Sequence, residues 1–233
     1  MCWRSSGSGS SAGRAADGSP TPSTKPGCRT DAGRGPAERP GGNTTVRVFV
    51  DTNVLFPFSV MDLMLALTED AVHEVVRSEQ LLLEWERVIV REQRRSPHSA
   101  AAVTQAVRRF FADCEIRASA YAHLVDEMPG EDPDDRHHAA AAVAAGAGAL
   151  ITWNLADFPA EDLSEHGVRV LDPDSYLCEL YAEVPHEVRE TVVRLAEEKR
   201  NPPVTALDAV ARLAKAGVPR FADLLTHDPE LRC

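Results

Sequence analysis

Residues 46–55 decide the fold, and they read Val-Arg-Val-Phe-Val-Asp-Thr-Asn-Val-Leu. The first five are β-branched or aromatic apart from Arg47, which predicts a short buried strand. The polar run Asp51-Thr52-Asn53 ends that strand, so the Asp51 carboxylate is expected at its carboxyl tip.

The pattern then alternates between strands and helices. Further strands are predicted at 73–77, 115–119, 149–152 and 168–171. Helices are predicted at 61–69, from Glu79 with Ser78 as N-cap, at 99–111, at 134–147 and at 159–164. This alternation predicts an α/β fold with a parallel sheet covered by helices on both faces, in which ligands bind beyond the carboxyl ends of the strands.

Composition divides the chain into three parts. Nine of the 14 glycines lie in the first 42 residues, where apolar residues are scarce, so residues 1–45 are predicted to be a disordered tail. Residues 46–180 form the predicted main domain, and 181–233 form a helical extension. In that extension, Val184, Val188, Val192 and Leu195 share a helix face that must be buried, either on the main domain or against a partner. Thr205 and Asp208 form a capping-box pattern for a second helix that ends at Gly217.

Charge and cysteine content narrow the function classes. The net charge of -11 disfavours non-specific adhesion to DNA or to anionic lipid. The five cysteines are widely spaced without a Cys-x-x-Cys pair, which argues against a disulfide framework or a zinc site. No apolar run is long enough to span a membrane, and we expect a cytoplasmic protein without a membrane partner.

Acidic residues follow several of the predicted elements. Asp51 and Asp157 come after strands, Glu84 lies within a helix, and Asp132, Asp134 and Asp135 open another helix. Taken singly, each has an ordinary explanation as a turn residue, a solvated side chain or a cap. Taken together, the two acids after strands, the one within a helix and one of the three at the helix start converge at one sheet edge, where their repulsion requires a cation. Oxygen ligands without cysteine favour Mg²⁺, with Mn²⁺ as the alternative.

Two other groups of residues have a functional and a structural interpretation. Between Arg87 and Arg109 there are six arginines and one acid, Glu92, so this stretch either tracks a phosphate backbone, docks an acidic partner or is a solvated helix face. His137 and His138 follow the acidic cluster, and we expect them on the helix surface rather than at a metal.

Four segments in order resemble the motifs of PIN-domain nucleases, and most of all the VapC-type toxins of bacterial type II toxin-antitoxin systems. They are Val48 through Leu55, Ser78 through Glu84, Asp132 through His137, and Ile151 through Pro159. The resemblance implies a three-layer α/β/α sandwich and a Mg²⁺-dependent endoribonuclease. It also implies an RNA substrate and a cognate antitoxin. Whether the chain forms a homodimer is left open.

By this resemblance, Asp51, Glu84 and Asp135 match the first three acids of the family and serve as catalytic and metal-binding residues. Many members carry an Asp two residues after the strand Thr, where this chain has Asn154, so Asp157 is proposed for the fourth position with Asn154 as the alternative. Glu84 would act through water or as an orienting base. The rivals are a catalytically silent PIN-fold interaction module and a phosphatase with Asp51 as nucleophile; the phosphatase is disfavoured because Asn53 stands where that chemistry needs an acid.

Overall fold

The structure is a computed structural model, and it describes residues 45–130 and 132–231. Four strands form its central sheet: β1 (Arg47–Val50), β2 (Glu74–Val76), β3 (Ala149–Ile151) and β4 (Arg169–Leu171). The predicted tail of residues 1–45 lies outside the described residues except for Thr45, which is buried.

All pairings in this sheet are parallel, and the strand order is β2-β1-β3-β4. Val50 pairs with Ile151 in the register of β1 and β3, so the residues that follow these two strands emerge side by side. This confirms the predicted α/β class and places Asp51 beside Thr152 at the carboxyl edge.

The predicted strand at 115–119 is wrong. Only a single bridge joins Arg77 to Glu115, and the chain turns into a short helix at Ala118. The backbone N–H of Ile116 still donates to the carbonyl of Arg77, so one extended residue completes the edge of β2 and no further strand forms.

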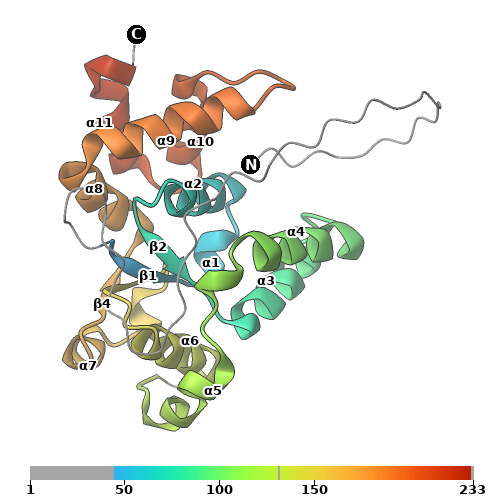
Figure 1. The fold of residues 1–233 in the computed structure, drawn as a ribbon, viewed down its shortest axis with the longest axis vertical. Coiled ribbons are helices and arrows are strands. Elements are labelled where there is room, and N and C mark those ends of the chain that lie inside the picture. The colour runs from blue at the N-terminus through green and yellow to red at the C-terminus, as the bar shows by residue number, and fades with distance from the viewer. Residues whose placement is uncertain (1–44, 131, 232–233) are drawn as a thin grey trace, which may run out of the picture.

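Helices connect the strands and continue beyond the last one (Figure 1). Their bounds are α1 (Thr52–Leu55), α2 (Phe58–Glu69), α3 (Glu79–Arg91), α4 (Pro97–Phe110), α5 (Ala118–Tyr121), α6 (Pro133–Ala144), α7 (Ala160–Glu165), α8 (Pro173–Glu183), α9 (Pro185–Glu198), α10 (Ala206–Lys215) and α11 (Pro219–His227). Two predicted starts are confirmed: the hydroxyl of Ser78 accepts from the N–H of Leu81 at α3, and Thr205 and Asp208 form the capping box of α10.

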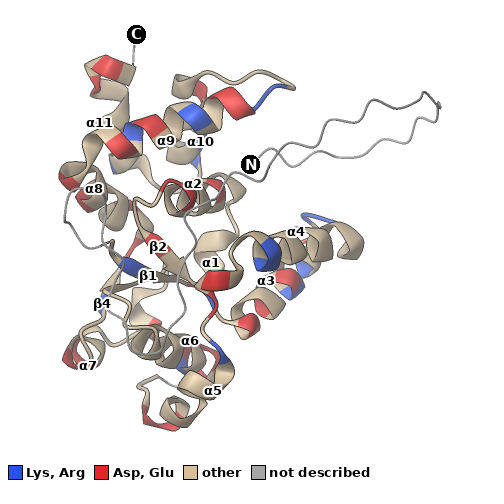
Figure 2. Cartoon of the chain, viewed as in Figure 1, with Lys and Arg blue, Asp and Glu red and all other residues tan. Residues whose placement is uncertain are grey.

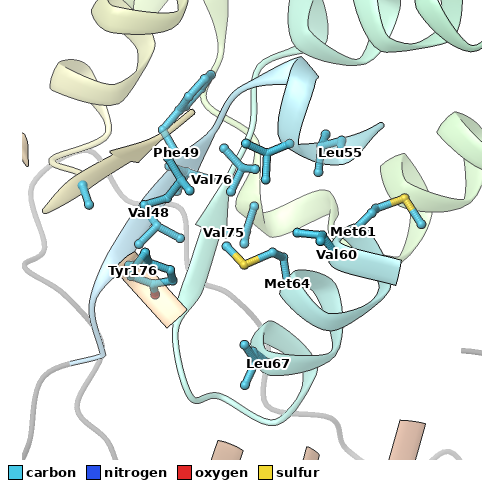
Figure 3. Packing of buried hydrophobic residues seen from close by; sticks show 14 of the residues in the cluster. Val48, Phe49, Leu55, Val60, Met61, Met64, Leu67, Val75, Val76 and Tyr176 are labelled. Atoms are coloured by element: carbon cyan, nitrogen blue, oxygen red, sulfur yellow. The ribbon is translucent and has the colours of Figure 1, made fainter. Parts of the chain in front are cut away.

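The sheet lies between two helical layers. Figure 1 shows α2 on one side of the strands and α6 on the other. On the α2 side, the buried side chains of Val48 and Val75 pack with Met64, as Figure 3 shows. On the α6 side, Phe49 packs against the ring of His138 with centroids 5.6 Å apart. Helix α6 therefore comes close to the sheet just below its carboxyl edge.

The C-terminal helices pack on the rest of the chain. Val188, Val192 and Leu195 of α9 are buried in the same hydrophobic core as the sheet, and α9 lies against α2. Polar contacts add to this packing, since the Thr191 hydroxyl donates to Asp70 at 2.7 Å. The apolar face of α9 is therefore buried on the main domain, which is one of the two predicted locations.

A buried hydrogen bond also ties α8 to the sheet layer. The Tyr176 hydroxyl lies 2.7 Å from Nδ1 of His73, whose Nε2 lies 2.8 Å from the Met64 carbonyl.

Within the described residues, no helix is both long and apolar enough to cross a membrane.

Candidate active site at the carboxyl edge of the sheet

The tips of β1 and β3 are joined by a network of side chains. Thr152 Oγ1 donates to Asp51 Oδ2 at 2.7 Å, and Asn53 Nδ2 donates to the same oxygen at 2.6 Å. The Asn53 amide oxygen accepts from the backbone N–H of Trp153 at 3.1 Å. Asp51 is the N-cap residue of α1, but its side chain makes no capping hydrogen bond. Its carboxylate accepts from Thr152 and Asn53 instead.

The second oxygen of Asp51 faces a buried histidine. Nδ1 of His138 lies 3.2 Å from Asp51 Oδ1, and Nε2 lies 3.2 Å from Glu84 Oε2. These are ion-pair distances, although the ring is not aligned for good hydrogen bonds with either carboxylate. Asp51 from β1 and Glu84 from α3 are thus brought together through one imidazole ring.

The surroundings of His138 act on its pKa in opposite directions. Burial lowers the pKa, but the two neighbouring carboxylates outweigh burial and raise it to about 9. At neutral pH the ring is therefore a cation that offsets the charge of Asp51 and Glu84.

The expectation that His138 lies on the helix surface is wrong, because its side chain is only 1% exposed. It lies one turn after Asp135, on the same helix face. The signal in the sequence is the following run Ala139–Ala142, which is buried throughout and whose small side chains allow α6 to approach the sheet. His137 is half-buried and packs edge-on against Tyr121.

The three acids at the start of α6 have different roles. Asp132 is the N-cap and accepts from the N–H of Asp134 at 2.9 Å. Asp134 accepts from Gln80 Nε2 at 3.1 Å. Asp135 is half-buried, and its pKa is raised to about 6, first by burial and then by the charges of Asp132, Asp157 and Asp51. Asp135 therefore stands in a region of excess negative charge.

Both candidates for the fourth position lie on the exposed segment after β3. Asn154 donates its backbone N–H to Thr152 Oγ1 at 3.0 Å, and its exposed side-chain amide forms no hydrogen bond with a described residue. Asp157 ends a single 3₁₀ turn (Leu155–Asp157), and its charge acts on Asp135.

The residues at this edge suit a hard divalent cation. Asp51, Asp135 and Asp157 supply only oxygen donors, and their charges are crowded enough to perturb Asp135. Across residues 45–130 and 132–231, however, no three acidic, histidine or cysteine side chains are already gathered as a metal-binding group. Glu84 Oε2, which is buried, makes its close contact with His138.

The C-terminal helices reach the site through Trp153. A Cβ placed on Gly217, between α10 and α11, would lie 3.0 Å from the Trp153 indole. Gly217 has φ +108°, so glycine supplies both the backbone conformation and the space. The residue that follows Thr152 is therefore packed against the C-terminal part of the chain.

Part of the arginine-rich stretch is neutralised within the chain. Arg108 pairs with Glu79 at 2.8 Å, and Arg91 pairs with Glu92 at 3.2 Å. The guanidinium groups of Arg94 and Arg95 instead lie over the rings of Phe56 and Phe58. Arg94 and Arg95, at the turn between α3 and α4, therefore have no carboxylate partner among the described residues. The same holds for Arg87 of α3 and for Arg109 of α4, whose guanidinium lies over Phe110.

The parallel sheet with acids at its carboxyl edge defines this chain as an α/β protein of the PIN class. Comparison with known families agrees: residues 47–156 match the PIN domain, and residues 173–227 match the VapC50 C-terminal domain. The chain therefore combines a PIN domain with a VapC-type C-terminal domain. No curated protein and no solved structure matches it.

Proposed function

We propose that this chain is a Mg²⁺-dependent endoribonuclease and the toxin of a toxin-antitoxin pair, acting in the cytoplasm. The observation that carries the proposal is the convergence of Asp51, Glu84 and Asp135 from separate elements at the carboxyl edge of a PIN-type sheet. The match to a VapC-type C-terminal domain supports the toxin assignment and a cognate antitoxin as partner.

Asp51, Asp135 and Asp157 would hold the cation, because their carboxylates crowd one another and the charge of His138 does not keep the pKa of Asp135 from being raised. Such an ion would neutralise charge on a phosphodiester and activate water. Mn²⁺ would serve the same donors.

The protein groups have distinct parts in this arrangement. Asn53 and Thr152 donate to one oxygen of Asp51 and so fix its orientation. His138 holds Glu84 toward the same place, which lets Glu84 orient a water molecule without being a direct ligand.

The experiment compares the wild-type chain with Asp51→Asn in a cleavage assay on mixed RNA, with Mg²⁺, Mn²⁺ or EDTA. Wild type should cleave only with a divalent cation, and Asp51→Asn should lose at least about 100-fold in rate, the scale of removing one electrostatic group. Circular dichroism should be unchanged, since Asn keeps the shape of the side chain.

The alternative function is a catalytically silent PIN-fold interaction module. The two functions are distinguished by assaying pure wild-type protein for RNA cleavage and for binding of a short protein encoded beside the gene. If RNA stays intact with Mg²⁺ and with Mn²⁺ while that short protein still binds the chain, the silent module is the correct interpretation.

A further inference from the structure

A two-lobed cleft lies where the C-terminal helices meet α2. One lobe has a volume of about 240 Å³ and the other about 220 Å³. The lobes adjoin, since both are lined by Phe58, Asp62, Lys199, Val204 and Arg212.

The first lobe is cationic. Arg95, Lys199 and Arg212 line it against one acid, Asp62. The Lys199 amine is already paired with Asp62 at 2.6 Å. Arg95 donates to the Ser99 hydroxyl at 3.5 Å and forms no ion pair with a carboxylate of the described residues. Arg212 is likewise outside ion-pair distance of these carboxylates, although its charge acts on that of Asp208 on the same helix. Figure 2 shows basic residues at both borders of this region, at the turn after α3 and at the end of α9. In a chain of net charge -11, this is a local site of positive charge.

The second lobe is mostly apolar. Val192 and Leu195 of α9 and Leu213 of α10 form its walls together with the Phe58 ring. A ligand that fills both lobes therefore needs an anionic group joined to a flat or apolar body.

We propose that this cleft binds a phosphorylated nucleotide, with the phosphate on Arg95 and Arg212 and the base in the apolar lobe. Guanidinium groups bind phosphate oxygens through paired hydrogen bonds. Phe58, which lines both lobes, offers a ring edge to the base. Its ring also lies 6.4 Å from that of Trp85, the neighbour of Glu84, so Phe58 links the cleft to the helix that carries Glu84.

The test measures binding in EDTA with the full chain, so that RNA stays intact. The probes are AMP and UMP by calorimetry and a short labelled single-stranded oligouridylate by fluorescence anisotropy. Arg212→Ala and Arg95→Ala should each weaken binding about tenfold, the value of one charge-assisted hydrogen bond. Each change should also lower the slope of log affinity against log salt by about one.

Lys215→Ala is the matched control, because Lys215 lies on α10 near Arg212 but does not line the cleft. Arg212 is exposed, so its variant should fold as wild type does even if Arg95→Ala disturbs the contact with Phe58. Binding of the mononucleotides identifies a free nucleotide as ligand, and binding of the oligonucleotide alone identifies a unit of a strand. Absence of binding to all three probes, or equal losses in Lys215→Ala and Arg212→Ala, would overturn the proposal.

Nucleotide binding in this cleft does not depend on cleavage at Asp51. An inactive chain whose affinity falls with Arg212→Ala would refute the nuclease and keep the cleft. An active chain whose affinity does not change with Arg212→Ala or Arg95→Ala would refute the cleft and keep the nuclease.

Discussion

His138 joins Asp51 to Glu84, with one ring nitrogen 3.2 Å from each carboxylate. The three residues come from α6, β1 and α3, so one buried ring ties together both layers around the carboxyl edge. Because the ring also packs on Phe49, its position is set by the core as well as by charge.

Replacing this histidine should destabilise the fold at neutral pH. His138→Phe keeps a ring against Phe49 but leaves two carboxylates without their cation, which typically costs about 3–5 kcal/mol for a buried pair. Urea unfolding at pH 7 measures the loss. His137→Phe is the control, since His137 packs against Tyr121 and forms no ion pair with a described carboxylate. Equal losses in both variants would show that the ion pairs of His138 are unimportant.

Metal binding should stabilise the chain. Mg²⁺ at 100 times its dissociation constant should raise the free energy of unfolding by about 2.7 kcal/mol. Asp135→Asn removes one of the crowded charges, so the metal-free variant should be more stable than wild type and should respond less to Mg²⁺. A melting temperature that does not change with Mg²⁺ or Mn²⁺ would contradict a metal site at this edge.

The fourth acidic position can be assigned by a pair of substitutions. Asp157→Asn should weaken Mg²⁺ binding about tenfold, or about 1.4 kcal/mol, as expected when one charged ligand is lost. Asn154→Ala should change the affinity little, because the hydrogen bond of Asn154 to Thr152 uses its backbone N–H. Calorimetric titration of both variants with Mg²⁺ decides between them. A larger loss of Mg²⁺ affinity in Asn154→Ala than in Asp157→Asn would assign the position to Asn154.

The contact between Gly217 and Trp153 should be sensitive to one methyl group. Gly217→Ala places a Cβ 3.0 Å from the indole at φ +108°, so it should lower the free energy of unfolding by about 1–3 kcal/mol. It should also reduce cleavage, because the backbone N–H of Trp153 donates a hydrogen bond to Asn53. Gly146→Ala is the control, with φ +61° and no atom within 4 Å of the added Cβ. If both variants lose the same stability and keep full cleavage, backbone strain alone explains the effect.

Acid should weaken the attachment of the last helices. The Tyr181 hydroxyl donates to Asp228 and, together with the Glu230 N–H and Arg189, holds the pKa of Asp228 below the usual value, although burial acts in the opposite direction. A carboxyl with a lowered pKa adds stability above its unfolded pKa, and this is lost as pH falls through the folded pKa. Asp228→Asn should therefore be less stable than wild type at pH 7, and the difference should shrink toward pH 3. A constant difference measured by thermal melting across that range would contradict this assignment.

Local patterns predicted much of the fold correctly. The strand before Asp51, the Ser78 cap and the Thr205–Asp208 capping box depend on neighbouring residues, and the structure confirms each. The segment 115–119 was predicted incorrectly because a short β-type pattern does not show whether a partner strand is free to pair along its length. Helix α11 was also missed, since its start depends on Asp174, which accepts from the N–H of Phe221 across 47 residues.

The order of strands and helices, and with it the gathering of acids at one edge, follows from the sequence, because parallel strands bring their carboxyl ends to the same side of the sheet. The partner of each acid does not follow from it. Asp132 caps α6 while Asp135 lies near Asp51, and His138 is inside although its neighbour is half exposed. These differences depend on how closely and at what rotation α6 packs on the sheet, a quantity set by the whole core and not by any local run of residues.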